Sequence, residues 1–501
     1  MARDAPWRRR PRWSTVLLIA LWTSMSVFAS LERTKASPSS TPTSYTCFDD
    51  ASWAVNTQDM SSRLPQQKQR YQEFMRKCAL VTNSSDFCQY EENWRMQLNM
   101  YQPQSVYNYT RMGFAKQRAP EALMSLLREF WDQNRNQLVA EWSTNNKERP
   151  YKQKATTYHN HWDAPTSIVR LYNRSLVGGG KNLQRTVTDL ARLELQKWTS
   201  MQLAATSTYG IRVYHNQSIL TPHVDRLPLV ISAIINVDQD LGPDQEPWPL
   251  EIYDHEGKAY NVTMEPGDMV FYESHSIIHG RPFPFSGNYF ANVFVHFEPI
   301  GPLLPDNVDG TSLSRFVDSR VFDTTKKVIP PYLVPGSPWE PEWREVNPDG
   351  WHVLRDPWIA IHRGDLPTLR YMVTLNPQLV HANADDEEEE GGWQPLFAAC
   401  RRGELDIVQF LVEQGANVNA IADEDSSEAL ISPLVICNQY HGADSAVSVY
   451  LRSQGARLDP RLQHIGKDTE RNNPSTGDST RGKTQSTEDT TVSSTPYASE
   501  L

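Results

Sequence analysis

Short runs of β-branched and aromatic residues, separated by turn residues, fill the chain between residues 208 and 298. The run at 228–237 is rich in Val and Ile and predicts a buried strand. Turn signals at 266–268 (Pro-Gly-Asp) and 286–288 (Ser-Gly-Asn) separate neighbouring runs. Because no helical pattern lies between them, the runs predict an antiparallel barrel or sandwich. Their bounds are 208–214, 228–237, 250–253, 259–264, 269–272, 276–283 and 289–297.

Hydrophobic residues recur at helical spacing before this strand-rich segment. In the stretch 119–142 they include Leu123, Leu127 and Trp131, and the stretch 183–198 shows the same pattern. We expect both stripes to pack as core rather than to contact a cofactor. The sequence therefore predicts a helical region before the strands.

A repeated helix–turn–helix pattern occupies residues 351–460. Its clearest copy, at 392–419, has apolar residues where two short helices would bury them, and Gly403 at the turn between them. Weaker copies occur at 357–383 and 433–459. The pattern closely resembles the ankyrin repeat, and about three such repeats are needed to stack into a core. The resemblance implies either a surface for a protein partner or a structural role in bracing the strand-rich domain.

Length and charge narrow the classes of protein that fit. The chain has 501 residues, enough for roughly two to four domains. Its formal net charge of −11 argues against a nucleic-acid-binding protein, whose contact surface is basic. The expected order is a targeting segment (1–30), a Cys-containing region (31–105), the strand-rich domain (106–300), a Pro-rich linker (301–350), the repeats (351–460) and a disordered tail (461–501).

The amino terminus carries a targeting pattern. Five arginines precede an apolar run at 15–29, which is short for a membrane span. Val27-Phe28-Ala29 resembles a signal-peptidase site, so a cleaved signal peptide is favoured over a type II signal anchor. Either would deliver the chain to the secretory pathway, with membrane contact only through the anchor. Five glycosylation sequons agree with this: Asn83, Asn108, Asn173, Asn216 and Asn261.

Three of the five cysteines lie near the start of the chain: Cys47, Cys78 and Cys88. In an oxidising lumen one pair among them can form a disulfide, which leaves at least one thiol. The sequence leaves the pairing open. It contains no C-x-x-C pattern of the kind that binds zinc.

The strongest chemical signal is the triplet His223-Val224-Asp225, followed much later by His279. Two imidazoles and one carboxylate can occupy one face of an Fe(II) octahedron, and three positions then stay open for a chelating co-substrate and O₂. A jelly-roll barrel would bring these distant residues together at its mouth. We therefore interpret His223, Asp225 and His279 as the metal ligands of a catalytic centre.

The residues around this triplet carry a family resemblance. Tyr214 lies nine residues before His223, the Pro-Gly-Asp turn follows, and His279 begins the sequence His-Gly-Arg-Pro-Phe-Pro. With these features residues 208–298 resemble the catalytic domain of prolyl 4-hydroxylase-type 2-oxoglutarate/Fe(II) dioxygenases. The resemblance implies an α+β fold with a double-stranded β-helix (jelly roll) and flanking helices. It also implies hydroxylation of a C–H bond, with peptidyl proline the first expectation, coupled to decarboxylation of 2-oxoglutarate to succinate.

The same resemblance assigns cofactors and one binding residue. It implies Fe(II), with 2-oxoglutarate and O₂ as co-substrates, ascorbate as reductant, and a protein or peptide as substrate. Tyr214 would help to hold the distal carboxylate of 2-oxoglutarate. The family usually has a lysine ten residues after the second histidine, where this chain has Tyr289. Because a buried dianion needs a cation or several donors, we expect Arg281 to replace the lysine. Arg212 is the second candidate, and the Tyr289 hydroxyl is a third contributor.

Alternatives remain at this stage for the ligands and for the function. His161 and Asp163 form a second H-x-D pattern that pairs with His215 at a similar spacing, and His275 competes with His279 as the distal ligand. The rival function is a catalytically degenerate barrel that serves as a scaffold for the ankyrin repeats. A third hypothesis is oxidation of a free small molecule.

Overall fold

The computed structural model describes residues 46–48, 65–141, 166–303, 317, 319–323, 325–383, 393–423 and 430–458. The predicted targeting segment, His161, Asp163 and the predicted tail lie outside these residues. By its contacts the chain divides into two units, Met1–Ser44 and Tyr45–Leu501, and all described residues belong to the second. None of the described helices is both long and apolar enough to span a membrane.

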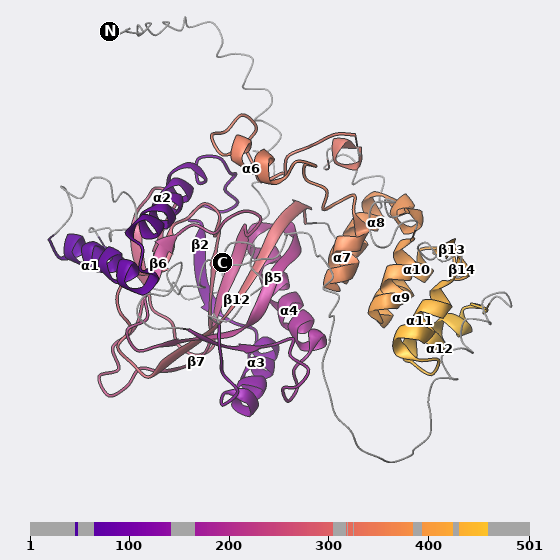
Figure 1. Cartoon of the computed structure of the whole chain (residues 1–501), viewed down its shortest axis with the longest axis horizontal. Helices are drawn as coiled ribbons and strands as arrows, with labels where there is room; N and C mark the ends of the chain where they lie inside the picture. The colour runs from indigo at the N-terminus through magenta and orange to yellow at the C-terminus, as the bar shows by residue number, and fades with distance from the viewer. Residues whose placement is uncertain are drawn as a thin grey trace, which may run out of the picture. The chain divides into compact units, whose positions relative to one another are not determined.

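Two antiparallel sheets form the centre of this unit (Figure 1). The larger sheet has the strand order β2-β10-β7-β12-β5-β4-β3, and the smaller has the order β1-β9-β8-β11-β6. This arrangement confirms the predicted double-sheet jelly roll. The larger sheet consists of β2 (Phe114–Arg118), β3 (Val139–Ala140), β4 (Ser167–Arg170), β5 (Met201–His215), β7 (Ile231–Asp240), β10 (Asp268–Tyr272) and β12 (Tyr289–Pro302). The smaller consists of β1 (Thr46–Phe48), β6 (Leu220–His223), β8 (Leu250–Tyr253), β9 (Ala259–Val262) and β11 (His279–Arg281).

Each face of the larger sheet buries a different apolar core. Ile234, Val270 and Phe290 point toward the smaller sheet and pack with Leu250 and Ile252. The intervening positions of the same strands face helices, because successive residues of a strand point to opposite faces. This pleat decides which side chains of β12 reach the space between the sheets.

Two helices cover the outer face of the larger sheet, as the sequence predicts. They are α3 (Glu121–Asn134) and α4 (Lys181–Thr199), and Leu127 and Val187 bury their apolar faces against β7 and β12. Helix α3 ends earlier than the predicted 142. The Asn134 side chain donates to the Val177 carbonyl at 2.9 Å and accepts from the Val177 amide at 3.0 Å, which draws the helix end toward another segment.

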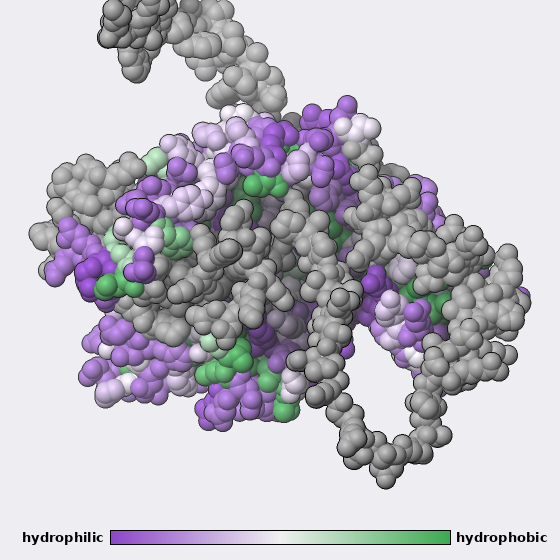
Figure 2. Space-filling view, in the orientation of Figure 1, coloured by the Kyte–Doolittle hydropathy of each residue, from purple (hydrophilic) through white to green (hydrophobic). Residues whose placement is uncertain are grey.

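A helical hairpin precedes the barrel strands. It consists of α1 (Pro65–Thr82) and α2 (Ser85–Tyr101), and a disulfide joins Cys78 to Cys88. The structure thus resolves the pairing that the sequence left open. The surface drawn in Figure 2 is mostly hydrophilic, with hydrophobic residues in small separate patches. Isolated exposed apolar side chains of this kind include Leu80, which is 67% exposed.

Three helix pairs follow the barrel, and they confirm the predicted ankyrin repeats. Gly364 and Gly403 end the first helices of two pairs with φ values of 67° and 75°, a left-handed conformation that favours glycine. The pairs are α7 (Pro357–Arg363) with α8 (Leu366–Leu375), α9 (Pro395–Arg402) with α10 (Leu405–Glu413), and α11 (Pro433–His441) with α12 (Ala446–Ser453). Shorter elements are η3 (Ser319–Phe322), α6 (Glu340–Val346), η4 (Pro377–His381), β13 (Ala422–Asp423) and β14 (Leu430–Ile431).

The repeats and the Pro-rich segment pack on the barrel. Arg192 of α4 pairs with Asp365, the N-cap of α8, at 2.6 Å, and both side chains are buried. In the Pro-rich segment Leu333 and Trp343 are buried in the core that also contains residues of the repeats. The described part of the predicted linker is therefore packed structure that joins two modules.

Candidate metal centre

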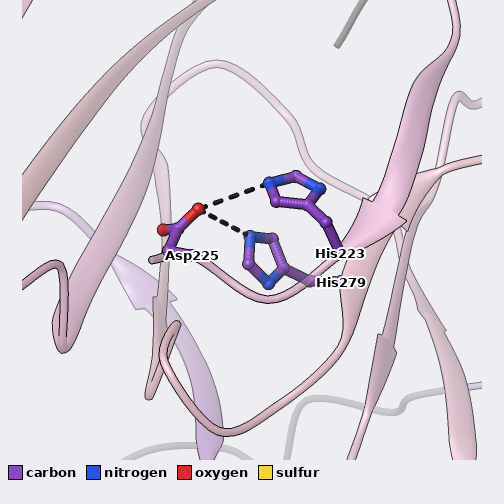
Figure 3. A group of neighbouring side chains, drawn as sticks. All are labelled: His223, Asp225 and His279. Carbon is purple, nitrogen blue, oxygen red and sulfur yellow. Dashed lines mark ion pairs between the residues drawn. The ribbon is translucent and has the colours of Figure 1, made fainter. Parts of the chain in front are cut away.

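Neighbouring strands bring the three predicted ligands together. His223 ends β6, and His279 begins β11 directly opposite it in the antiparallel register. Asp225 follows β6 by two residues, where its amide donates to the Ser274 carbonyl at 2.7 Å. Figure 3 shows the three side chains pointing toward one another. The strand pairing therefore joins residues that are far apart in the sequence.

The distances between the side chains fit one metal ion. Asp225 Oδ1 lies 3.3 Å from His223 Nε2 and 3.8 Å from His279 Nε2, and one ligand atom of each residue lies within 4.8 Å of the others. Ligands at adjacent corners of an octahedron with bonds of about 2.1 Å are about 3.0 Å apart. Small side-chain movements therefore suffice for these atoms to occupy one face of a coordination sphere.

Hydrogen bonds orient both imidazoles for this purpose. His223 Nδ1 lies 2.6 Å from the Thr221 carbonyl oxygen, and His279 Nδ1 lies 3.1 Å from the Ile277 carbonyl oxygen. Because a carbonyl only accepts, each Nδ1 carries the proton and each Nε2 presents its lone pair toward Asp225. This is the tautomer that binds a metal through Nε2.

Burial sets the charge of the centre. It lowers the pKa of His279 to about 4, and the neighbouring His223 adds to the effect, so the imidazole is neutral near pH 7. Burial opposes ionisation of Asp225, but contact with His223 and the imidazoles of His279 and His296 lowers its pKa. Divalent cations bind histidine in its neutral form and aspartate in its ionised form.

A third histidine lies beside this group and was missed in the sequence. His296 Nδ1 is 3.5 Å from Asp225 Oδ2 and 2.7 Å from the Ser232 hydroxyl, and burial lowers its pKa. It comes from β12, where Phe290, Asn292, Phe294 and His296 alternate with residues that face the helices. That period of two was the available signal, because it places His296 between the sheets.

Arg212 is already paired where it borders the centre. A cavity beside the ligands is lined by His223, Asp225, His279, Arg212, Glu141, Ile168, Tyr209, Gly210, Leu220, Leu229, Tyr272, Phe294 and His296. The Arg212 guanidinium donates to both carboxylate oxygens of Glu141 at 2.5–2.9 Å. Arg212 therefore has a counterion within the protein.

Arg281 is in the opposite situation. Its side chain is 1% exposed, and its guanidinium contacts the rings of Trp248 and Phe290, 4.6 and 4.5 Å from their centroids. It donates to the Trp248 carbonyl and to Met264 Sδ, at 3.6 Å for the latter. Within the described parts of the chain no carboxylate pairs with it, and burial lowers its pKa to about 10. Arg281 is thus a buried cation without a carboxylate partner among the described residues, and it is not one of the residues that line the cavity beside the ligands.

Tyr214 stands near both guanidiniums. Its side chain is fully buried and contacts Trp248 edge to face, with ring centroids 5.1 Å apart. Burial raises the pKa of Tyr214, whereas the charges of Arg212 and Arg281 lower it. The hydroxyl, which Arg212 also contacts, therefore lies in a positive environment suited to a carboxylate.

Tyr289 does not join this group, so the prediction that it contributes a hydroxyl is corrected. Its hydroxyl donates to Asp238 Oδ2 at 2.6 Å, and its ring lies 6.1 Å from that of Trp131 in α3. The pleat of β12 turns Tyr289 toward the helices and Phe290 toward the space between the sheets. Tyr289, ten residues after His279, lies on the face of β12 that points toward the helices.

The competing histidines lie elsewhere among the described residues. His215 Nε2 contacts the Ser167 hydroxyl at 3.0 Å, and His275 Nε2 contacts the Tyr107 carbonyl at 3.1 Å. Neither belongs to the group that can hold a metal. His279 is thus the histidine that the fold places opposite His223.

Comparisons with known proteins identify the carboxy-terminal module. Residues 340–431 match the family described as ankyrin repeats (3 copies). The carboxy-terminal module consists of ankyrin repeats. The human protein "Ankyrin repeat domain-containing protein 49" is 31% identical to this chain over 133 residues, which make up 24% of this chain and 53% of that protein. The chain thus spans about half the length of this curated relative.

Solved structures similar to the chain include two prolyl hydroxylases. A prolyl-4-hydroxylase from Pseudomonas putida is 14% identical and aligns over 38% of this chain and 93% of its own, with a TM-score of 0.27. A prolyl hydroxylase from Trichoplax adhaerens is 11% identical and aligns over 48% of this chain and 96% of its own, also with a TM-score of 0.27. HygX from Streptomyces hygroscopicus was solved with nickel, 2-oxoglutarate and hygromycin B. It is 10% identical and aligns over 38% of this chain and 84% of its own, with a TM-score of 0.26.

Proposed function

We propose that the barrel is an Fe(II)- and 2-oxoglutarate-dependent dioxygenase that hydroxylates a C–H bond. The observation that carries this proposal is the convergence of His223, Asp225 and His279, with both Nε2 atoms facing the carboxylate. Three such ligands occupy one half of an octahedral sphere and leave the other half for co-substrates. Bound Fe(II) would couple decarboxylation of 2-oxoglutarate to succinate and CO₂ with insertion of oxygen from O₂ into the substrate.

Arg281 is the cation that we assign to the distal carboxylate of 2-oxoglutarate. Arg281 and His279 are two residues apart on β11 and therefore share a face of the sheet. The guanidinium lacks a carboxylate partner among the described residues, while Arg212 is neutralised by Glu141. Tyr214 donates its hydroxyl to the same carboxylate, as the family resemblance implies. Two aromatic rings hold the Arg281 guanidinium in place before the ligand arrives.

The substrate that we propose is a protein or peptide, with peptidyl proline as the first candidate, and ascorbate is the proposed reductant. Ankyrin repeats generally bind proteins, so the repeats are a candidate surface for the substrate or for a separate partner. The predicted signal places these reactions in the secretory pathway, inside the lumen or outside the cell. The competing proposal remains a degenerate barrel that acts as a binding scaffold.

Succinate formation by the purified full chain distinguishes an enzyme from a scaffold. With Fe(II), 2-oxoglutarate, O₂ and ascorbate we expect succinate, and we expect no succinate from H223A or D225A. The matched control is H381A, which replaces an exposed histidine of η4 and should retain full turnover. Equal rates in wild type and H223A would eliminate the dioxygenase proposal.

Addition of substrates then separates the peptide and small-molecule hypotheses. If a peptide is the substrate, a panel of Pro-rich peptides should raise succinate formation above its rate without substrate, and the product should gain 16 mass units, the mass of one oxygen atom. If no peptide raises the rate while a free small molecule does, the peptide proposal is wrong although the enzyme proposal stands.

A further inference from the structure

Helix α2 lies against the backbone of the metal-ligand segment. Strand β6 is at the edge of the smaller sheet, so one side of it has no neighbouring strand to satisfy its backbone N–H and C=O groups. On that side the Asn99 amide accepts from the Val224 N–H at 2.9 Å and donates to the Pro222 carbonyl at 3.2 Å. One side-chain amide thus replaces the hydrogen bonds that a further strand would make on either side of His223.

Gln102, just after α2, connects the two parts of the metal centre. Its Nε2 donates to the Asp225 carbonyl at 2.7 Å and to the His275 carbonyl at 2.8 Å. The first carbonyl belongs to a metal ligand, and the second belongs to the loop that leads to His279. The Gln102 side chain is fully buried, so neither carbonyl can obtain a hydrogen bond from water in its place.

A buried ion pair and an apolar contact complete this arrangement. Arg95 donates to the Pro222 carbonyl and pairs with Glu92 one turn earlier on α2, at 2.6 Å. Leu98, on the same helix, belongs to a buried cluster with Val224 and Ile278, which adjoin the ligands. Polar and apolar contacts from one helix face therefore reach the chain beside every metal ligand.

We propose that Arg95, Asn99 and Gln102 are positioning residues, which hold the ligand segments in the geometry that binds metal. This inference rests on the proposed function, because it assumes that His223, Asp225 and His279 are the ligands. None of the three residues on α2 reaches the metal. They fix the backbone of the segment that carries His223 and Asp225, and they link it by hydrogen bonds to the loop that precedes His279. Loss of such supporting partners weakens metal binding about 10- to 100-fold.

The test is a titration of the metal-free full chain with Co(II), followed by its visible absorption, together with thermal unfolding of the metal-free protein. The variants N99L and Q102L remove the hydrogen bonds at nearly constant volume. Their matched controls, N93L and Q97L, make the same replacements at exposed positions of α2. We expect dissociation constants about 10- to 100-fold higher for N99L and Q102L than for their controls.

Two comparisons keep this inference separate from the proposed function. If H223A binds Co(II) as tightly as wild type, the ligand assignment fails and the proposed function with it. If H223A loses binding while N99L and Q102L stay within twofold of their controls, only the positioning role is refuted. A purely structural role would lower the unfolding temperature without changing the dissociation constant or the spectrum of the bound metal. Should the leucine variants not fold, N99D and Q102E provide a second comparison at the same side-chain size, with N93D and Q97E as controls. Q102E removes both donated hydrogen bonds, whereas N99D removes the bond to Pro222 and keeps the acceptor for the Val224 N–H.

Discussion

Replacement of Arg281 by Met is the sharpest test of how the proposed enzyme binds 2-oxoglutarate. Methionine keeps an unbranched apolar chain against Trp248 and Phe290 but removes the guanidinium. Loss of one partner of a buried ion pair leaves the other charge uncompensated, at a cost of about 3–5 kcal/mol. Since about 1.4 kcal/mol corresponds to a factor of ten, we expect the KM for 2-oxoglutarate to rise at least about 100-fold.

The metal-free, ligand-free protein should respond in a different way. There Arg281 is buried without a carboxylate partner among the described residues, so its removal relieves an unpaired charge rather than breaking a pair. We expect the unfolding temperature of ligand-free R281M to equal or exceed that of wild type. The stabilisation that 2-oxoglutarate gives to wild type should be absent in the variant, because binding to the folded state is what raises stability.

Steady-state succinate formation and thermal unfolding measure both effects, and R212M is the matched control. Arg212 already pairs with Glu141. R212M should therefore destabilise the ligand-free protein, because the Glu141 carboxylate loses its guanidinium partner. Co(II) affinity should be unchanged in R281M, which separates anion binding from metal binding. A KM for 2-oxoglutarate that changes less than threefold in R281M, or more in R212M than in R281M, refutes the assignment of Arg281.

Three further predictions concern stability. R192M should lower the free energy of unfolding by about 3–5 kcal/mol in urea titrations, because the buried Asp365 carboxylate loses its guanidinium partner. Adding D365N should recover part of this loss. C88A should cost about 3 kcal/mol or less by removing the cross-link in the helical hairpin, and an unchanged urea midpoint would contradict this. G403A should cost more than about 1 kcal/mol, because φ is 75° and the added Cβ would lie 2.6 Å from the His441 ring. Circular dichroism during thermal unfolding checks this value.

Short apolar runs bounded by turn residues predicted some of the strands well. The run at 250–253 became β8 without change, and 269–272 became β10 with one residue added at its start. The spacing of His223, Asp225 and His279 also predicted which side chains meet, since strand pairing brings them together. Strand bounds depend on residues that are neighbours in the sequence, and the spacing of the three ligands is a pattern that a whole fold family shares.

Contacts between distant segments could not be read from the sequence. Asn99 looks like an ordinary polar helix residue until the edge of β6 is seen beside it. Glu141 gives no sign in the sequence that it neutralises Arg212. Tyr289 was misassigned because a residue count does not determine which face of a strand a side chain occupies. In each case the deciding factor is tertiary packing, which local propensity does not encode.

The strands that reach the metal centre also reach the ankyrin repeats. On β5 the Ala205 amide donates to Asp365 at 3.0 Å, and further along the same strand Arg212 borders the cavity. On β12 His296 lies beside Asp225, and Glu298, two residues later, accepts from Tyr332 and Trp351 at 3.0 and 3.1 Å.

A fragment that ends at residue 300 would therefore lack both donors to Glu298. It would also remove Asp365, the closer of the two carboxylates that pair with Arg192, and leave Asp189. The repeats thus brace the barrel through the same strands that carry its site residues, whatever partner they bind. An inactive barrel fragment would consequently say little about the chemistry, and the full chain is the form in which His223, Asp225 and His279 should be tested.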